Sequence, residues 1–156
     1  MSTKRKICIV FSWLVVAVIT MMIYKLSAQN AEESKELSDS LVSKILQWIQ
    51  VYIDGELIRK FAHMLEFTAL SFFLANSIYV TLKTKSATII AFAITVLCAV
   101  GDEIHQIFVP GRAFQTTDIL VDSAGALIGA ILYFALVKLI FNIKERGKEN
   151  GNIKTI

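Results

Sequence analysis

The feature that most constrains the fold is a series of four long apolar runs, each bounded by clusters of charged residues. The runs cover approximately residues 7–26, 61–80, 87–108 and 119–141. An apolar run of about 20 residues is long enough to cross a bilayer as a helix. Only 19% of the 156 residues are charged, whereas water-soluble domains carry about 25%. The sequence therefore predicts an all-α membrane protein, a four-helix bundle of transmembrane helices forming one domain over residues 1–156.

The basic residues that flank the runs predict the orientation of the helices. They lie before the first run, between the second and third, and after the fourth: Lys4, Arg5, Lys6, Lys83, Lys85, Lys144, Arg146 and Lys148. Short cytoplasmic segments carry such an excess of Lys and Arg. We therefore expect both termini on the cytoplasmic side of the membrane. The net charge of +3 is small, so no nucleic-acid partner is expected.

The first run has an alternative interpretation as a signal peptide, with a cleavage site near Ser27 and Ala28. Its uninterrupted part, Ile7 to Tyr24, contains 18 residues. The apolar region of a signal peptide has about 7–15 residues. We therefore expect an uncleaved first transmembrane helix.

Residues 36–54 have the periodicity of an amphipathic helix, with apolar side chains on one half of the helical wheel. Trp48 and Tyr52 suit the membrane–water boundary. This segment is predicted to lie on the outer surface between the first and second spans. Packing onto the bundle is the alternative.

The ionisable side chains of the second, third and fourth helices are concentrated toward their outer ends. The candidate binding residues are Lys60, His63, Glu66, Asp102, Glu103, His105, Gln106, Arg112, Asp118 and Asp122. At a rise of about 1.5 Å per residue, Glu66, Asp102 and Asp122 lie within roughly 8 Å of the outer boundary. Ionisable residues inside membranes usually face the interior of a bundle. We therefore predict that these three acids meet in one pocket.

Several of these residues also have simpler interpretations. Asp118 can act as a helix N-cap, Lys60 can reach lipid phosphates, and Arg112 can neutralise Asp118 or Glu103. His63 and His105 can serve in hydrogen bonding or packing.

The remaining motifs concern helix packing and metal binding. Gly125 and Gly129 form a small-xxx-small motif, which lets a neighbouring helix approach closely. Cys8 and Cys98 lie in apolar runs without Cys-x-x-Cys spacing, so they are predicted to be small buried residues. No metal site and no cofactor are predicted.

Two motifs in this order resemble the VanZ-like family of small bacterial membrane proteins. The first is His63-x-x-Glu66-Phe67-x-x-Leu70. The second begins at Asp102-Glu103-Ile104-His105-Gln106, continues through Pro110-Gly111-Arg112, and ends with Asp118-x3-Asp122-x2-Gly125-x3-Gly129. The resemblance covers residues 60–132, with Phe67 where Tyr is common and Asp122 where Asn often stands. It implies a role in resistance to glycopeptide antibiotics such as teicoplanin, but no assigned active site.

Two functions are consistent with this sequence. In the first, the outer-leaflet pocket binds an amphiphilic or lipid-linked ligand, such as a cell-wall precursor or a lipoglycopeptide, with Arg112 and Lys60 facing phosphate. In the second, the protein is a membrane enzyme that performs acid/base or metal-assisted chemistry on such a lipid. Its candidate catalytic residues are His63, Glu66, Asp102, Glu103 and Asp122. A proton path is disfavoured because the inner halves of the helices lack acids.

Overall fold

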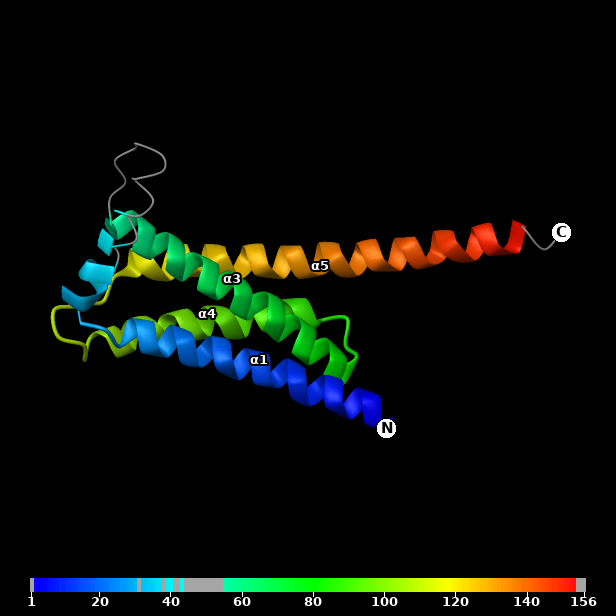
Figure 1. Ribbon diagram of the computed structural model, residues 1–156, viewed down its shortest axis with the longest axis horizontal. Coiled ribbons are helices and arrows are strands. Elements are labelled where there is room, and N and C mark those ends of the chain that lie inside the picture. Colours follow the sequence, from blue (N-terminus) through cyan, green and yellow to red (C-terminus); the bar gives the residue numbers. More distant parts are fainter. Residues whose placement is uncertain (1, 31, 38, 41–42, 44–54, 154–156) are drawn as a thin grey trace.

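The computed structural model describes residues 2–30, 32–37, 39–40, 43 and 55–153. Its long helices are α1 (Thr3–Ser27), α3 (Gly55–Leu82), α4 (Ala87–Gln106) and α5 (Thr116–Ile153), arranged as shown in Figure 1. All four are long and apolar enough to cross a membrane. Within the described ranges the chain forms helices and turns without a strand. The predicted all-α fold with four membrane-spanning helices is confirmed.

Two helix ends differ clearly from the predicted spans. Helix α4 ends at Gln106, before the 108 that was predicted, because a turn follows in which Val109 N–H donates to Gln106 O at 3.1 Å. Helix α5 continues to Ile153, beyond the predicted end at 141 and through a polar segment. Lys and Glu in that segment are good helix formers. Most of the predicted amphipathic helix, 36–54, lies outside the described residues.

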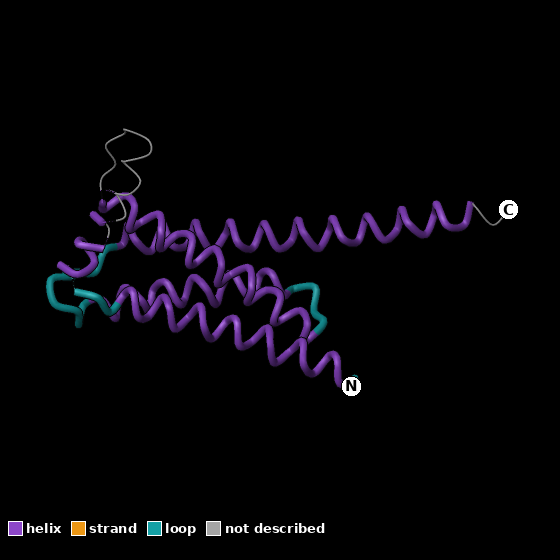
Figure 2. The backbone as a smooth tube through the Cα atoms, viewed as in Figure 1, coloured by secondary structure: helices purple, strands orange, loops and turns teal. Residues whose placement is uncertain are grey.

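Helix α3 is the centre of the arrangement, because it packs against α1, α4 and α5. Helices α1 and α4 make few contacts with each other. Figure 2 shows the α4–α5 loop at one end of the bundle and the α3–α4 turn at the other. Both termini lie toward the end with the α3–α4 turn (Figure 1). The end with the α4–α5 loop is called the loop end below.

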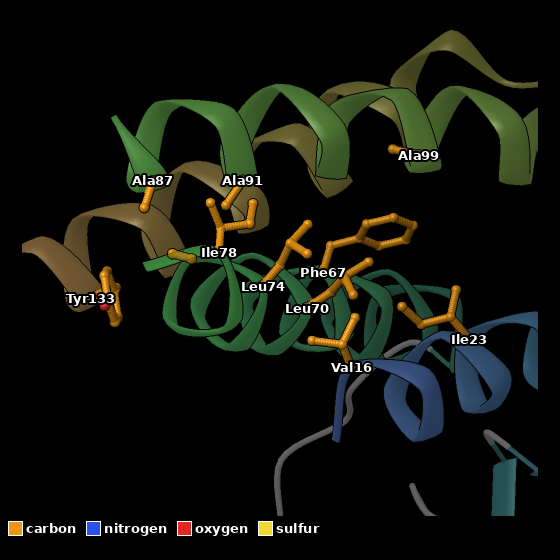
Figure 3. Packing of buried hydrophobic residues seen from close by; sticks show 11 residues of the cluster. Val16, Ile23, Phe67, Leu70, Leu74, Ile78, Ala87, Ala91, Ala99 and Tyr133 are labelled. Atoms are coloured by element: carbon orange, nitrogen blue, oxygen red, sulfur yellow. The ribbon is translucent and has the colours of Figure 1, made fainter. Parts of the chain in front are cut away.

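Apolar side chains of α3 fill the space between the helices. Figure 3 shows this packing, in which buried α3 residues face small residues of α4 and branched residues of α1. The labelled members are Val16, Ile23, Phe67, Leu70, Leu74, Ile78, Ala87, Ala91, Ala99 and Tyr133. The alanines of α4 let the two helix backbones approach closely. The core therefore fixes α3 and α4 against each other.

One sequence-based expectation about burial is wrong. Cys8 and Cys98 were expected to be buried and are both exposed. A membrane surrounds the bundle with hydrocarbon, so apolar character does not distinguish a packed face from a lipid-facing one.

The contact between α3 and α5 depends on two glycines. A Cβ added at Gly125 would overlap the backbone carbonyl oxygen of Met64, and one at Gly129 would overlap that of Thr68. The Thr68 hydroxyl donates a hydrogen bond to Gly125 O at 3.0 Å. This close approach brings the first turns of α5, which carry Asp122, against the first turns of α3.

Candidate functional site

The polar side chains of three helices gather at the loop end. They come from the N-terminal turns of α3, the C-terminal turns of α4, the loop and the N-terminal turns of α5. We call this set the polar cluster: Lys60, His63, Glu66, Asp102, Glu103, His105, Gln106, Arg112, Asp118 and Asp122. Its least exposed members are Glu103 at 0%, Asp122 at 2%, Gln106 at 5% and Asp102 at 9%. The structure therefore places all ten candidate residues at one end of the bundle.

Glu103 joins α4 to the start of α5. Its Oε2 atom accepts the backbone N–H of Gln115 at 2.7 Å. Gln115 immediately precedes α5, where backbone N–H groups have no partner within the helix. The other carboxylate oxygen, Oε1, is buried and has no hydrogen-bond partner in the protein. One oxygen of Glu103 is thus structural, and the other is free to meet a ligand.

Asp102 belongs to a hydrogen-bonded link between α4 and α1. The Nε2 atom of Gln106 donates to Asp102 Oδ2 at 3.2 Å and lies 3.4 Å from Ser27 Oγ. Ser27 is the last residue of α1 and is fully buried. Sequence reasoning missed Ser27 as part of the site. The one sequence feature that marks Ser27 is its position as a small polar residue at the end of an apolar run.

Lys60 bridges two acids at the surface of the cluster. Its Nζ atom lies 3.2 Å from Glu56 Oε1 and 3.3 Å from Asp118 Oδ1. The Lys60 and Asp118 side chains are 26% and 16% exposed. Such partly exposed ion pairs typically contribute at most about 1 kcal/mol. Lys60 can therefore be displaced at low cost.

Arg112 ties the α4–α5 loop to the end of α1. Its Nε atom donates to the backbone oxygen of Gln29 at 2.9 Å. No carboxylate of the described residues lies within 4.0 Å of it, so the expected pairing with Glu103 or Asp118 is not formed. Burial lowers the pKa of the guanidinium, and the positive charge of Arg59 adds to this effect. Arginine nonetheless stays charged in proteins, and its buried Nη2 atom has no partner in the protein.

The two histidines have different surroundings. The Nδ1 atom of His63 lies 3.7 Å from Glu66 Oε2, which is too far for a hydrogen bond, and both atoms are buried without a partner. The His105 ring stacks on Tyr24 with centroids 4.8 Å apart, consistent with a packing role. Its Nε2 atom is also buried without a partner. His63 is therefore the histidine that borders the other polar groups of α3.

The first cavity at the loop end is called the polar pocket. It is lined by Arg59, Lys60, His63, Glu103, Gln106, Arg112, Asp118, Val121 and Asp122. Its volume is about 10 Å³, which is room for about one water molecule. A larger polar group can enter only when Lys60 or Arg59 moves away.

The second cavity is larger and mostly apolar, and is called the α1–α4 groove. It has a volume of about 260 Å³. Its lining residues are Thr20, Ile23, Tyr24, Phe67, Leu70, Cys98, Gly101, Asp102 and His105. The sequence analysis named Asp102 and His105 but not the groove itself, because its other lining residues look like ordinary lipid-facing or packing positions.

A third cavity, of about 150 Å³, contains Glu66 together with Arg59 and His63. The expectation that Glu66, Asp102 and Asp122 share one pocket is therefore corrected: the three acids line three adjoining cavities. The polar pocket shares Arg59 and His63 with this third cavity. Electrostatic repulsion still connects the acids, because Asp122 interacts unfavourably with both Asp102 and Glu66.

Sequence reasoning also gave too little weight to Glu103, which is the most buried acid among the described residues. The signal that identifies it is a run of small residues at four-residue spacing on α4, formed by Ala87, Ala91, Thr95 and Ala99, which are all fully or almost fully buried. Glu103 is the next position in this series. Small residues mark helix contacts in membranes better than large apolar ones do.

Buried polar atoms without a partner are concentrated in the polar cluster. Eight side-chain atoms of the described residues are buried and lack a hydrogen-bond partner in the protein. Six of them belong to the cluster, namely those of His63, Glu66, Glu103, His105, Arg112 and Asp122. Each such atom costs about 1–3 kcal/mol. An arrangement of this kind fits a site whose polar atoms are satisfied by a bound molecule.

The chemistry available in the polar pocket is hydrogen bonding and charge pairing. Glu103 Oε1 and Asp122 Oδ1 are acceptors, while Arg112 Nη2 is a charged donor. Over the described ranges, no group of three or more His, Cys, Asp or Glu side chains is arranged to hold a metal ion. The donor set therefore suits a polar organic group that carries both hydrogen-bond donors and an anionic oxygen.

Comparison with known families agrees with the two sequence motifs. The family model described as VanZ/LLP1 matches residues 11–140, which is most of the chain. No curated protein and no solved structure matches the chain. The match extends well beyond residues 60–132, on which the resemblance was first noted, and includes most of α1 and α5.

Proposed function

This chain belongs to the VanZ/LLP1 family, a family linked to teicoplanin resistance, and from that membership we propose a specific role. The protein is a multi-pass protein of the bacterial cytoplasmic membrane that binds an amphiphilic or lipid-linked ligand at its polar cluster. By doing so it lowers susceptibility to teicoplanin-type antibiotics. The observation that carries this proposal is the set of six buried polar atoms at the loop end that have no partner in the protein; one of the six residues, His105, also lines the α1–α4 groove.

The proposed orientation places the polar cluster in the outer leaflet. Seven basic residues lie at the opposite end, near the start of α1, the α3–α4 turn and the C-terminal part of α5: Lys4, Arg5, Lys6, Lys83, Lys85, Lys144 and Arg146. Among the described residues the loop end carries fewer, including Lys25, Arg59, Lys60 and Arg112. Short cytoplasmic segments are enriched in such residues. With the termini inside, the polar cluster meets molecules at the outer surface of the membrane, where cell-wall precursors and glycopeptides are found.

The polar pocket supports binding of a head group through its charges. Arg112 offers a donor to an anionic oxygen, and bidentate contacts of arginine with phosphate are among the strong polar interactions. Glu103 and Asp122 offer acceptors to hydroxyl or amide groups. Because Lys60 is held only by partly exposed ion pairs, the head group opens the pocket by displacing it.

The test measures teicoplanin susceptibility in a strain that lacks the gene and in the same strain expressing the wild-type or a variant chain. We expect wild-type expression to raise the inhibitory concentration at least fourfold, and Asp122→Leu to abolish this increase. Because Asp122 Oδ1 has no partner and the neighbouring acids repel it, the same substitution should not lower the thermal midpoint of the purified protein. Asp122→Asn keeps a polar side chain and retains most of the effect.

Glu145→Gln, an exposed change at the opposite end, is the matched control and should behave as wild type. Membrane levels of all variants are compared by immunoblot. An unchanged inhibitory concentration on wild-type expression, or full activity of Asp122→Leu at normal abundance, would refute the proposed role.

A second candidate function is catalysis on a lipid-linked substrate. It is favoured by His63, which lies beside the carboxylate of Glu66 and lines the same pocket as Glu103 and Asp122. A histidine among unpartnered carboxylates suits general acid/base chemistry. Comparing lipid extracts from cells that express wild type, Asp102→Asn or Glu66→Gln by mass spectrometry tests this. A lipid species that changes with wild type and not with the variants supports catalysis, whereas identical lipid profiles count against it.

A further inference from the structure

The α1–α4 groove has the shape and chemistry of a binding site for a hydrocarbon chain. One wall is formed by Ile23 and Tyr24 of α1, the other by Gly101 of α4, and the floor by Phe67 and Leu70 of α3. Figure 3 shows Ile23 beside Leu70 in the core. Protein interiors are close-packed, and voids larger than a water molecule are few. A mostly apolar groove of about 260 Å³ in a membrane-spanning surface is therefore a feature that requires an occupant.

The groove has two causes, the separation of α1 from α4 and the absence of a side chain at Gly101. Helices α1 and α4 make few contacts with each other, so the surface of α3 is uncovered between them. Gly101 has no side chain, and a Cβ built at this position meets no atom within 4 Å. Tyr24, at the rim, is 58% exposed. In a bilayer this opening faces lipid, and hydrocarbon is the only material available to fill it.

The groove ends at polar groups, which distinguishes it from an ordinary gap between lipid-facing helices. Asp102 and His105 line it, and His105 Nε2 is buried without a partner. The Asp102–Gln106 hydrogen bond of 3.2 Å separates the groove from the polar pocket, because Gln106 lines the pocket and Asp102 lines the groove. An apolar chain in the groove thus brings its attached head group to Asp102 and Gln106.

We propose that the α1–α4 groove binds the single hydrocarbon chain of a lipid-linked ligand, which enters sideways from the bilayer between α1 and α4 and presents its head group to the polar cluster. The ligand class is a one-chain amphiphile whose head group carries hydroxyl or amide donors for Asp102. The stack of Tyr24 on His105 bridges α1 and α4 at the loop end of the groove, so the chain lies on the core side of this contact, and the volume of about 260 Å³ suits one chain rather than two. This inference rests on the proposed function and names the part of the ligand that the groove holds.

The experiment uses the full-length protein in phosphatidylglycerol vesicles that contain a trace of lysophosphatidylglycerol with a diazirine at the end of its chain. After irradiation, the labelled residues are mapped by mass spectrometry. We expect labelling to be concentrated on the groove residues Ile23, Tyr24, Leu70 and Cys98. Gly101→Leu places a side chain in the groove from a position where an added Cβ meets no atom within 4 Å, and it should lower this labelling at least fivefold.

Ala93→Leu is the matched control, because it adds the same side chain to an exposed position of α4 that does not line the groove. It should leave the labelling unchanged. If Gly101→Leu does not fold, Cys98→Leu blocks the same groove from an exposed position. Labelling spread evenly over lipid-facing residues, or labelling of the groove that neither filling variant reduces, would overturn the inference.

The outcomes separate this inference from the proposed function. If the groove binds no chain, Asp122→Leu still abolishes teicoplanin protection, because the polar cluster acts alone. If the protein has no role in teicoplanin susceptibility, wild-type expression gives no protection while groove labelling and its loss in Gly101→Leu remain. Deacylated teicoplanin provides an additional comparison: protection against the acylated form only is expected when the groove takes the antibiotic's own chain.

Discussion

The contact between α3 and α5 offers the sharpest prediction about stability. Gly125→Ala adds a Cβ that overlaps the carbonyl oxygen of Met64, and Gly129→Ala adds one that overlaps the carbonyl oxygen of Thr68. Both obstacles are backbone atoms of α3, which cannot rotate away as a side-chain end can. The two helices must therefore separate, and the apolar contact between them loosens along its length.

The magnitude follows from three terms. Overpacking of a well-packed contact typically costs about 1–3 kcal/mol. Separation also weakens the hydrogen bond from Thr68 to Gly125, and such interhelical bonds average about 0.6 kcal/mol in membranes. Replacing glycine by alanine in a helix returns up to about 1 kcal/mol. We therefore expect each variant to lose about 1–3 kcal/mol. The double variant should lose less than twice that, because one separation relieves both overlaps.

Gly101→Ala is the matched control for this measurement. It makes the same chemical change in a membrane-spanning helix, at a position where the added Cβ meets no atom within 4 Å. It should keep or slightly raise the stability, by up to about 1 kcal/mol. Unfolding is followed in detergent by titration with sodium dodecyl sulfate and by the thermal midpoint. If Gly125→Ala and Gly129→Ala behave like Gly101→Ala, the close approach of α3 and α5 is wrong.

Three further outcomes test other parts of the structure. Glu103→Ala leaves the partly buried N–H of Gln115 without its acceptor, so it should lower the stability in detergent by about 1 kcal/mol, whereas Glu103→Gln, which keeps an oxygen acceptor, should lose less. Arg112→Ala removes the bond between the loop and α1 and should speed hydrogen exchange at the C-terminal turn of α1; unchanged exchange would show that this bond does not hold the loop. In a background without the native cysteines, Ala113→Cys should react with a membrane-impermeant maleimide in intact cells, and Lys85→Cys only after permeabilisation; the reverse pattern would invert the proposed topology.

The sequence was sufficient for the fold because length and apolarity decide which segments can cross a bilayer. The four spans and the convergence of polar residues at one end follow from run length, from the distribution of basic residues and from the rise per residue along a helix. Position along the helix axis was therefore predictable. His63 and Asp122, for example, lie on different helices and line the same pocket.

The face that each helix turns toward the bundle was less predictable, because a membrane-spanning helix is apolar on both its packed and its lipid-facing sides. Helix α4 illustrates this. Cys98 was predicted to be buried and is exposed, whereas the buried stripe of small residues leads to Glu103. The α1–α4 groove was not predictable, since it depends on the small contact between α1 and α4 and on the absence of a side chain at Gly101.

A purely structural role does not explain why the polar cluster leaves buried polar atoms without hydrogen bonds, whereas most buried hydroxyls in the middle of the helices are hydrogen-bonded. In the middle of the helices, the hydroxyls of Ser77 and Thr95 donate to the carbonyl oxygens four residues earlier, at 2.9 and 2.8 Å. Ser71 is the exception. At the loop end the pattern changes, because Glu103 bonds through one carboxylate oxygen and leaves the other buried and unpartnered. Bonds that hold the helices in place coexist there with polar atoms that no protein group satisfies, which is the arrangement expected of a rigid frame around a ligand.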